Sequence, residues 1–204
     1  MSCYPRLFLE NEVKALVLCG GQSTRMGSDK GLIVNADNRT WADVVVDICN
    51  ESKLDTYVSI HPSQQMSYNN RFDECILIQD MYPPIGPIGG LLSAHHRFPD
   101  SDFLILSCDM QDVDQEFVEF ILSHHELLSE YDALIPFIEG FYQPFPGLYS
   151  SELLSKITKL HLLDALPNYS LQQIFNTTVV YQLTVPQIHV KKLKSYNSPE
   201  DIVS

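Results

Sequence analysis

Positive charge is scarce in this chain: its 204 residues hold 13 lysines and arginines against 26 aspartates and glutamates, a formal net charge of −13. Proteins that bind nucleic acids neutralise the phosphate backbone with rows of Lys and Arg, which a strongly acidic surface lacks. We therefore expect no nucleic-acid partner. A small anion can still bind where the fold gathers its few cations together with backbone N–H groups.

Long apolar runs are also lacking. None approaches the roughly 18–20 residues that cross a bilayer, and residues 1–12 mix charged with apolar side chains, unlike a secretory signal. The cysteines are odd in number and widely spaced, without a CxxC pair, which argues against a disulfide framework and a zinc site. We therefore expect a cytoplasmic protein with reduced thiols and no membrane partner. Four cysteines sit in or beside apolar runs, where a thiol behaves as a small hydrophobe: Cys19, Cys49, Cys75 and Cys108.

Short apolar runs alternate with amphipathic stretches along the first 130 residues. The runs at 13–18, 56–60, 75–78 and 103–107 are typical of strands buried on both faces of a parallel sheet. Thr40 and Asp43 form a capping-box pattern before an amphipathic helix. Further helices are expected at 63–69, at 90–97, and from Asp112 or Asp114 to Leu128. The order predicts an α/β fold, a three-layer α/β/α arrangement around a Rossmann-like, mostly parallel sheet.

The pattern after residue 130 is less regular. Strands are expected at 133–137, 145–149 and 179–183, and helices at 151–163 and 171–175. Ser198, followed by Pro199 and an acid, predicts the start of a last short helix. Because no repeat, low-complexity segment or Ser/Gly linker interrupts the chain, residues 1–204 are expected to form one domain.

A glycine-rich segment, residues 18–30 with the sequence LCGGQSTRMGSDK, directly follows the first predicted strand. Glycines allow backbone N–H groups to approach an anion closely, and Ser23 can donate a hydroxyl. Arg25 and Lys30 place two cations within six residues. The spacing fits neither the GxxxxGK[ST] nor the GxGxxG phosphate motif. The segment is therefore interpreted as an anion-binding loop of another kind, with an ordinary Gly-rich turn as the alternative.

This segment resembles the Leu-Ala-Gly-Gly-x-x-x-Arg-Met-Gly-x-Asp-Lys signature of the molybdenum cofactor guanylyltransferases, with Cys19 in place of the alanine. The adjacent glycines are similar to the guanylyl branch rather than to cytidylyl or sugar nucleotidyltransferases. The resemblance implies a sheet of the nucleotide-diphospho-sugar transferase type. It also implies catalytic roles for Arg25 and Lys30. The nucleotide-binding residues that it implies in this segment are Leu18, Cys19, Gly20, Gly21, Ser23 and Lys30.

Further landmarks resemble the same family in the same order. Asp80 and the Gly-Pro segment from Gly86 resemble its guanine-side segment, and Ser59 stands where some members contact the nucleotide. Asp109, within Ser-Cys-Asp-Met, resembles the magnesium-binding aspartate, a third catalytic residue that also binds the nucleotide. The resemblance implies an acceptor side at Gln143, Pro144 and Asn197. It divides the chain into a nucleotide-binding half, about 10–110, and an acceptor-side half, about 111–204.

The residues themselves support two of these roles. Asp109 follows a predicted strand at the rim that carries the glycine-rich segment, and a hard carboxylate there suits Mg²⁺. A helix cap is the alternative. Asp80 follows the neighbouring strand, and its carboxylate can accept both the N1–H and the amine of guanine, which rejects adenine. A solvated loop acid is the alternative there.

Other residues depart from the family pattern or point to no site. Gln111 and Ser195 replace a usual proline and asparagine, and Ser59 an asparagine. The pairs 95–96 and 124–125 are expected to be surface histidines rather than metal ligands. The lysines at 191, 192 and 194 form either a solvated strand end or a cationic rim for the phosphate of the acceptor.

The expected function is Mg²⁺-dependent transfer of GMP from GTP to molybdopterin, with transient contacts to proteins that handle molybdopterin or receive the cofactor. One alternative is a nucleotidyltransferase for another nucleotide or acceptor, such as CTP with molybdopterin, or a sugar phosphate. Another is a nucleotide-binding regulatory protein without turnover.

Overall fold

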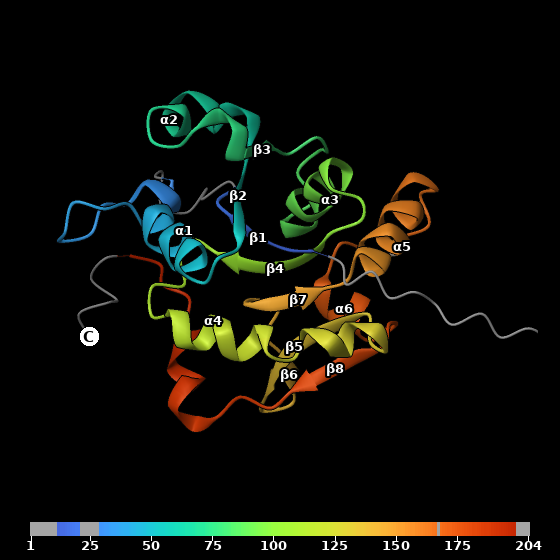
Figure 1. The fold of residues 1–204 in the computed structure, drawn as a ribbon. Helices are drawn as coiled ribbons and strands as arrows, with labels where there is room; N and C mark the ends of the chain where they lie inside the picture. The colour runs from blue at the N-terminus through green and yellow to red at the C-terminus, as the bar shows by residue number, and fades with distance from the viewer. Residues whose placement is uncertain (1–11, 21–28, 167, 199–204) are drawn as a thin grey trace, which may run out of the picture.

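The computed structural model describes residues 12–20, 29–166 and 168–198 (Figure 1). Their strands form one eight-stranded sheet in the order β3-β2-β1-β4-β7-β5-β6, with β8 paired to β5. The strands are β1 (Val13–Leu18), β2 (Asp55–Ile60), β3 (Leu77–Gln79), β4 (Asp102–Ser107), β5 (Ala133–Ile138), β6 (Phe141–Tyr142), β7 (Gly147–Tyr149) and β8 (Val180–Leu183). The pairs from β3 to β4, and β5 with β8, are parallel, whereas β7 pairs antiparallel with β4 and β5. The predicted α/β fold with a mostly parallel sheet is confirmed.

Helices cover both faces of the sheet and enclose two apolar cores. On one face α1 (Trp41–Glu51) and α4 (Gln115–Leu122) pack over β1 and β4, and on the other lie α3 (Pro87–Arg97), α5 (Ser151–Leu162) and α6 (Leu171–Phe175) (Figure 1). The short α2 (Gln65–Asn69) lies in the β2–β3 connection. The 3₁₀ turns are η1 (Lys30–Leu32), η2 (Pro62–Gln64), η3 (Glu74–Ile76), η4 (His125–Ser129) and η5 (Gln187–Leu193). None of the helices in the described ranges is long and apolar enough to cross a bilayer.

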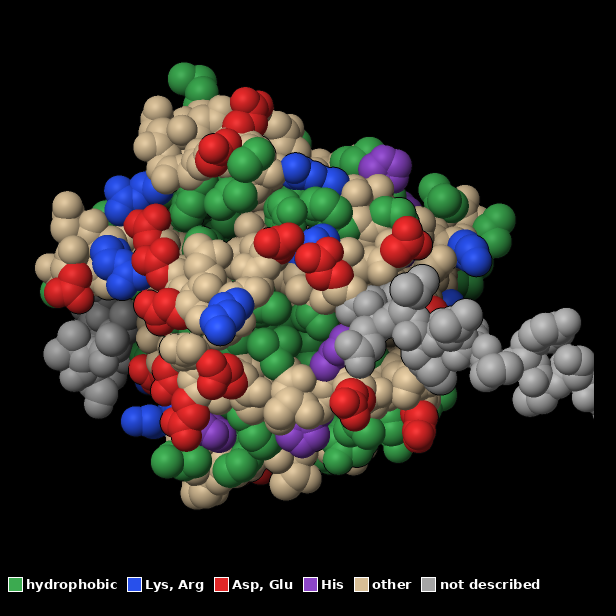
Figure 2. Space-filling view, viewed as in Figure 1, with side chains coloured by type: hydrophobic (Ala, Val, Ile, Leu, Met, Phe, Trp, Pro, Cys, Tyr) green, Lys and Arg blue, Asp and Glu red, His purple; other side chains and the backbone are tan. Residues whose placement is uncertain are grey.

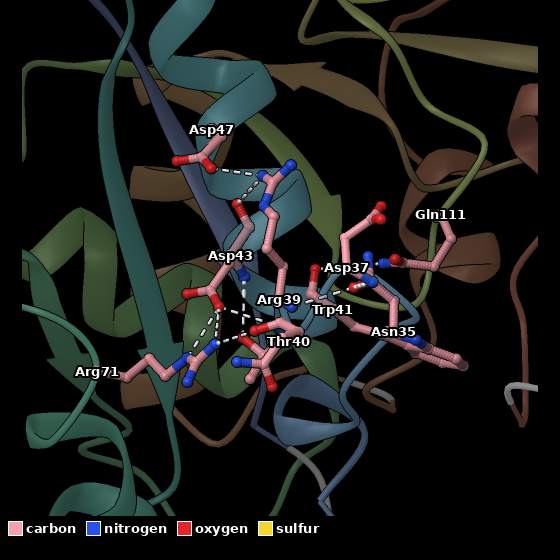
Figure 3. A network of polar contacts seen from close by, with 10 residues as sticks. Asn35, Asp37, Arg39, Thr40, Trp41, Asp43, Asp47, Arg71 and Gln111 are labelled. Atoms are coloured by element: carbon pink, nitrogen blue, oxygen red, sulfur yellow. Dashed lines mark hydrogen bonds and ion pairs between the residues drawn. The ribbon is translucent and has the colours of Figure 1, made fainter.

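The predicted capping box at the start of α1 is present. The Thr40 hydroxyl accepts a hydrogen bond from the Asp43 N–H, and the Asp43 carboxylate accepts one from the Thr40 N–H at 2.8 Å (Figure 3). Arg71, from the segment after α2, donates to the same carboxylate at 2.6 Å. Although burial acts to raise the pKa of Asp43, the hydrogen bonds from Arg71 and Thr40 outweigh it and lower that pKa. The cap therefore also ties the β2–β3 connection to α1.

Several predicted element ends are wrong. The strand expected at 75–78 begins at Leu77, because residues 74–76 form the turn η3, which Asp73 caps. Cys75 is therefore exposed. The other three cysteines of the apolar runs are buried as predicted: Cys19, Cys49 and Cys108. Helix α3 begins at Pro87 rather than at residue 90, since Gly86, with φ of 71°, provides its N-cap. Helix α4 ends at Leu122, so the predicted face at Leu128 belongs to η4.

The sheet brings the ends of its parallel strands to one rim. Leu18 is the Cα partner of both Ser59 on β2 and Ser107 on β4. The chain segments that leave these strands therefore start side by side, and ligands of open α/β sheets bind at such carboxyl ends.

Candidate active site

The segment after β1 lies against the end of β2. The N–H groups of Cys19 and Gly20 both donate to the carbonyl of Ser59, at 2.9 and 3.0 Å. A Cβ atom at Gly20 would lie 3.1 Å from Oδ2 of Asp80, which is tighter than side-chain contacts normally are. A side chain at position 20 would therefore fit only if the Asp80 carboxylate moved by a few tenths of an ångström.

Asp80 and Ser59 form a polar pair beside this backbone. The Ser59 hydroxyl donates to Oδ1 of Asp80 at 3.0 Å. Burial raises the pKa of Asp80, while the hydrogen bond from Ser59 and the charge of His61 act to lower it. Oδ2 faces Gly20 and Gly89, whose Cβ positions would lie 3.1 and 3.8 Å away. A carboxylate oxygen bordered by two glycine backbones is suited to accept hydrogen bonds from a ligand.

Lys30 and Asp109 meet at the same rim. The Lys30 ammonium lies 2.8 Å from Oδ2 of Asp109, and it also donates to the carbonyl of Tyr196 and to Oδ1 of Asn197, both at 3.1 Å. Asp109 is 9% exposed, and its Oδ1 has no hydrogen-bond partner among the described residues. A buried carboxylate oxygen without a partner is costly unless a ligand or a cation completes it.

The remaining predicted residues have different outcomes. Gly21, Ser23 and Arg25 lie outside the described residues, as does most of the last predicted helix. Leu18 is a buried end residue of β1, and Gly86 serves the N-cap of α3 through its positive φ. Gln143 donates its N–H to the carbonyl of Pro136, and Pro144 accepts from the Tyr149 hydroxyl, so both lie in the turn between β6 and β7. Asn197, predicted on the acceptor side, accepts a hydrogen bond from the Lys30 ammonium at 3.1 Å.

Tyr196 is a site residue that sequence reasoning missed. Its N–H donates to the Asp109 carbonyl at 3.0 Å, its hydroxyl to the Asp112 carboxylate at 2.5 Å, and its own carbonyl accepts from Lys30. It is 4% exposed. No local pattern marked it, because every one of these partners is distant in the chain.

Two expectations about charged residues are corrected. Lys192 is neither a solvated nor a rim cation: it is 5% exposed and forms ion pairs with Asp114 at 2.6 Å and Glu116 at 3.7 Å. His95, expected at the surface, is buried on α3, and burial lowers its pKa.

A multi-ligand metal centre is absent from the described part of the chain, where no three His, Cys, Asp or Glu side chains gather. A single carboxylate such as that of Asp109 is compatible with a cation that takes one or two carboxylates and completes its shell with phosphate oxygens and water, as Mg²⁺ does.

Comparison with known proteins identifies the family of the chain. A family model described as MobA-like NTP transferase domain matches residues 15–178. A probable molybdenum cofactor guanylyltransferase of Bacillus cytotoxicus is 28% identical over 182 residues, or 88% of each chain. One from Methanothermobacter thermautotrophicus is 26% identical over 91% of this chain and 95% of its own.

A solved structure supports the same assignment at the level of the fold. The molybdopterin-guanine dinucleotide biosynthesis protein A of Archaeoglobus fulgidus matches with a TM-score of 0.75 at 20% identity, over 93% of this chain and 95% of the other. Because the family model matches residues 15–178, which is most of the chain, the chain belongs to the MobA-like NTP transferases, a family of nucleotidyltransferase enzymes.

Proposed function

We propose that this protein is a molybdenum cofactor guanylyltransferase, which transfers GMP from GTP to the phosphate of molybdopterin and releases pyrophosphate. The observation that carries the proposal is the buried Asp109 carboxylate. One of its oxygens is paired with Lys30, while the other lacks a partner among the described residues. Together with the Asp80–Ser59 pair, this arrangement is suited to a nucleoside triphosphate. The names of the relatives favour guanine and molybdopterin.

Asp109 is the residue that would hold Mg²⁺ in this proposal. Its unpartnered Oδ1 supplies the hard anionic oxygen that this ion prefers. When bound, Mg²⁺ supplies positive charge that neutralises phosphate oxygens of the nucleotide. The Lys30 ammonium already uses three hydrogen bonds on protein oxygens, so it exchanges some of them for triphosphate oxygens when the nucleotide binds.

The transfer step needs no nucleophilic side chain, because the phosphate of the acceptor is already an anion. An oxygen of that phosphate forms a bond to the α-phosphorus of GTP, while the bond from this phosphorus to the bridging oxygen breaks. The electron pair of the broken bond leaves with pyrophosphate. The protein contributes position and charge: Lys30 and the backbone N–H groups of the glycine-rich segment hold the triphosphate, and Arg25 neutralises the leaving group.

Asp80 would select the base. Oδ1 accepts from Ser59 with one of its lone pairs, so the two carboxylate oxygens can still accept the N1–H and the amine of guanine, with Oδ2 between two glycines. Adenine offers no such donor pair and would leave Oδ2 without a partner, which costs binding free energy.

Residues 111–204 would bind molybdopterin, with Gln143 and Pro144 beside it. Asn197, which contacts Lys30, would lie between the two substrates. Delivery of the finished cofactor would take place in transient contact with proteins that handle molybdopterin or receive the cofactor.

The test is pyrophosphate release with GTP, CTP or ATP as donor and molybdopterin-loaded protein as acceptor, at several Mg²⁺ concentrations. We expect turnover with GTP alone. Asp109→Asn should keep the fold, lose most of the rate and require more Mg²⁺, whereas Asp37→Asn, at an exposed loop position, should change neither. Turnover with CTP instead would contradict the proposed base. Nucleotide binding without any pyrophosphate release would favour a regulatory protein.

A further inference from the structure

A partly buried polar hub lies next to Lys30, centred on the side chain of Asp29. Its Oδ1 accepts the N–H of Gly31 at 3.0 Å, which caps the turn η1, and also the hydroxyl of Tyr68 at 3.0 Å. Its Oδ2 accepts Nε2 of Gln64 at 2.5 Å. The carboxylate that sets the backbone at Lys30 is thus held by two side chains from the β2–β3 connection.

Gln64 joins three parts of the rim. Its Nε2 donates to the carbonyl of Cys19 at 3.1 Å as well as to Asp29, and its Oε1 accepts the N–H of His61 at 2.6 Å. One amide group therefore links the chain after β1, the chain after β2 and the turn that carries Lys30. A side chain engaged at both ends of its amide has little freedom to move.

Tyr68 supports the same turn. It is fully buried, and burial, with the neighbouring Cys19 and Asp29, raises the pKa of its hydroxyl, so the hydroxyl stays protonated and donates. A Cβ atom at Gly31 would overlap this hydroxyl oxygen. Only glycine at position 31 allows the backbone to contact the Tyr68 hydroxyl this closely.

Lys30 itself has a flexible four-carbon stem, so the position of its ammonium depends on where its backbone is fixed. It must reach Asp109 and Asn197, which come from distant parts of the chain. Fixing the turn therefore determines whether the ammonium arrives in the correct place. Supporting residues of this kind set the precision of a site without contacting its ligand.

We propose that Gln64 and Tyr68 are positioning residues, which act through Asp29 to hold Lys30 for the triphosphate of the nucleotide. This inference rests on the proposed function only in that Lys30 binds a nucleoside triphosphate, whichever base it carries.

The experiment is a double-mutant cycle on the affinity for Mg–GTP, Mg–CTP and Mg–ATP, measured by calorimetry. Tyr68→Phe removes one oxygen and keeps the ring in the core, and we expect about fivefold weaker binding, the effect of one lost hydrogen bond. Gln64→Glu places a carboxylate against Asp29, and we expect a larger loss. In Lys30→Ala protein, itself roughly 10- to 100-fold weaker, neither change should weaken binding further, because residues that act through Lys30 lose their effect with it.

Turnover gives an independent readout. Tyr68→Phe should lower kcat/KM for the nucleotide and leave KM for the acceptor unchanged. The control is Tyr57→Phe, which removes the hydroxyl of a half-buried tyrosine whose ring packs on Phe98, and it should bind nucleotide normally.

Equal losses in the unaltered protein and in the Lys30→Ala background would overturn the proposal, since Tyr68 and Gln64 would then contact the nucleotide or support the fold generally. Unchanged affinity in Tyr68→Phe and Gln64→Glu would also overturn it. Preference for CTP contradicts only the proposed base, and the cycle is then completed with CTP. If the unaltered protein binds none of the three nucleotides, both proposals fail.

Discussion

Asp80 shows how one residue of the site can oppose stability. Burial raises the pKa of its carboxyl, so ionising it is harder in the folded protein than in the unfolded chain. The Ser59 hydroxyl and the charge of His61 offset only part of this cost. A carboxylate with a raised pKa in a site of this kind is a candidate for ligand binding.

Asp80→Asn is therefore expected to stabilise the ligand-free protein. The amide oxygen keeps the hydrogen bond from Ser59, and the buried charge is removed. We expect the free energy of unfolding at pH 7 to rise by about 0.5–2 kcal/mol, the usual range for relief of such a conflict. Thermal melts measure this change. In the same variant, preference for GTP over ATP should be lost, because an amide oxygen accepts the guanine donors less strongly than a carboxylate does.

The stabilising effect of Asp80→Asn should increase with pH. Because the folded pKa of Asp80 is raised, the stability contributed by this group is fully present below the ordinary pKa of 3.8 that it has in the unfolded chain. It is lost as pH rises through the folded pKa. The melting-temperature difference between Asp80→Asn and the unaltered protein should thus be small near pH 3.5 and reach its full size towards neutral pH. A difference that is independent of pH would mean that the charge of Asp80 is not the cause.

Single residues were predictable from sequence where their chemistry depends on a strand end. Lys30, Asp80 and Asp109 follow apolar runs or a glycine-rich segment, and they lie at the predicted rim. Tyr196 and Tyr68 were not predictable, because each contributes through partners that only the tertiary fold brings near.

Elements with strong local signals were also predictable. The capping residues Thr40 and Ser150 give α1 and α5 starts close to those expected, because a cap satisfies N–H groups within one turn. The lysines at 191, 192 and 194 were predicted as either a solvated strand end or a cationic rim, whereas residues 187–193 form η5. Lys192 of η5 packs inward against α4, and no periodicity in the sequence records that contact.

A buried ion pair joins η5 to α4, beside the ring of His189, which stacks on Phe117. Asp114 caps α4 by accepting the Phe117 N–H at 3.0 Å, and it pairs with the buried ammonium of Lys192. Although burial acts to raise the pKa of Asp114, the hydrogen bonds from Lys192 and Phe117 outweigh it and lower that pKa. The pair therefore contributes stability that is present above the unfolded pKa and lost as pH falls through the folded one.

Asp114→Asn isolates this contribution, since asparagine also caps helices. We expect it to lower the free energy of unfolding at pH 7 by about 1–3 kcal/mol, because the buried Lys192 ammonium keeps only the distant Glu116. The loss should shrink as pH falls from 3.8 through the lowered folded pKa of Asp114, as followed by urea unfolding. Asp47→Asn, which breaks the exposed pair with Arg39, is the matched control and should cost no more than about 1 kcal/mol. Equal losses in the two variants would show that burial of the pair is unimportant.

At the scale of the whole molecule, acidic side chains outnumber cations across the face that Figure 2 shows. Several of the cations are already paired within the described chain: Lys14 with Asp55, Arg71 with Asp43, Lys156 with Asp132, and Lys192 with Asp114. Lys30 differs because its partner, Asp109, still has an unpartnered buried oxygen. Composition predicted that positive charge had to be gathered somewhere. Composition could not predict which cations form ion pairs elsewhere in the fold, or that the Lys30 ammonium lies at this rim.

A ligand that completes this rim should stabilise the whole domain, because it binds the folded chain and not the unfolded one. At a concentration about 100 times its dissociation constant, such a ligand adds about 2.7 kcal/mol. For a domain of this size, that corresponds to roughly 5–10 °C in melting temperature. We expect Mg–GTP to produce this shift in thermal melts and ATP to produce much less of it.

Asp109 decides how that shift depends on the metal. With EDTA in place of Mg²⁺, the shift with GTP should shrink, because the carboxylate then faces the triphosphate without a cation between them. In Asp109→Asn the repulsion is absent and the anionic ligand for the metal is lost, so GTP should shift the melt by similar amounts with and without Mg²⁺. If the unaltered protein responds to GTP equally in Mg²⁺ and in EDTA, Asp109 does not hold a metal. Its unpartnered oxygen would then belong to the hydrogen-bond network around Lys30 alone.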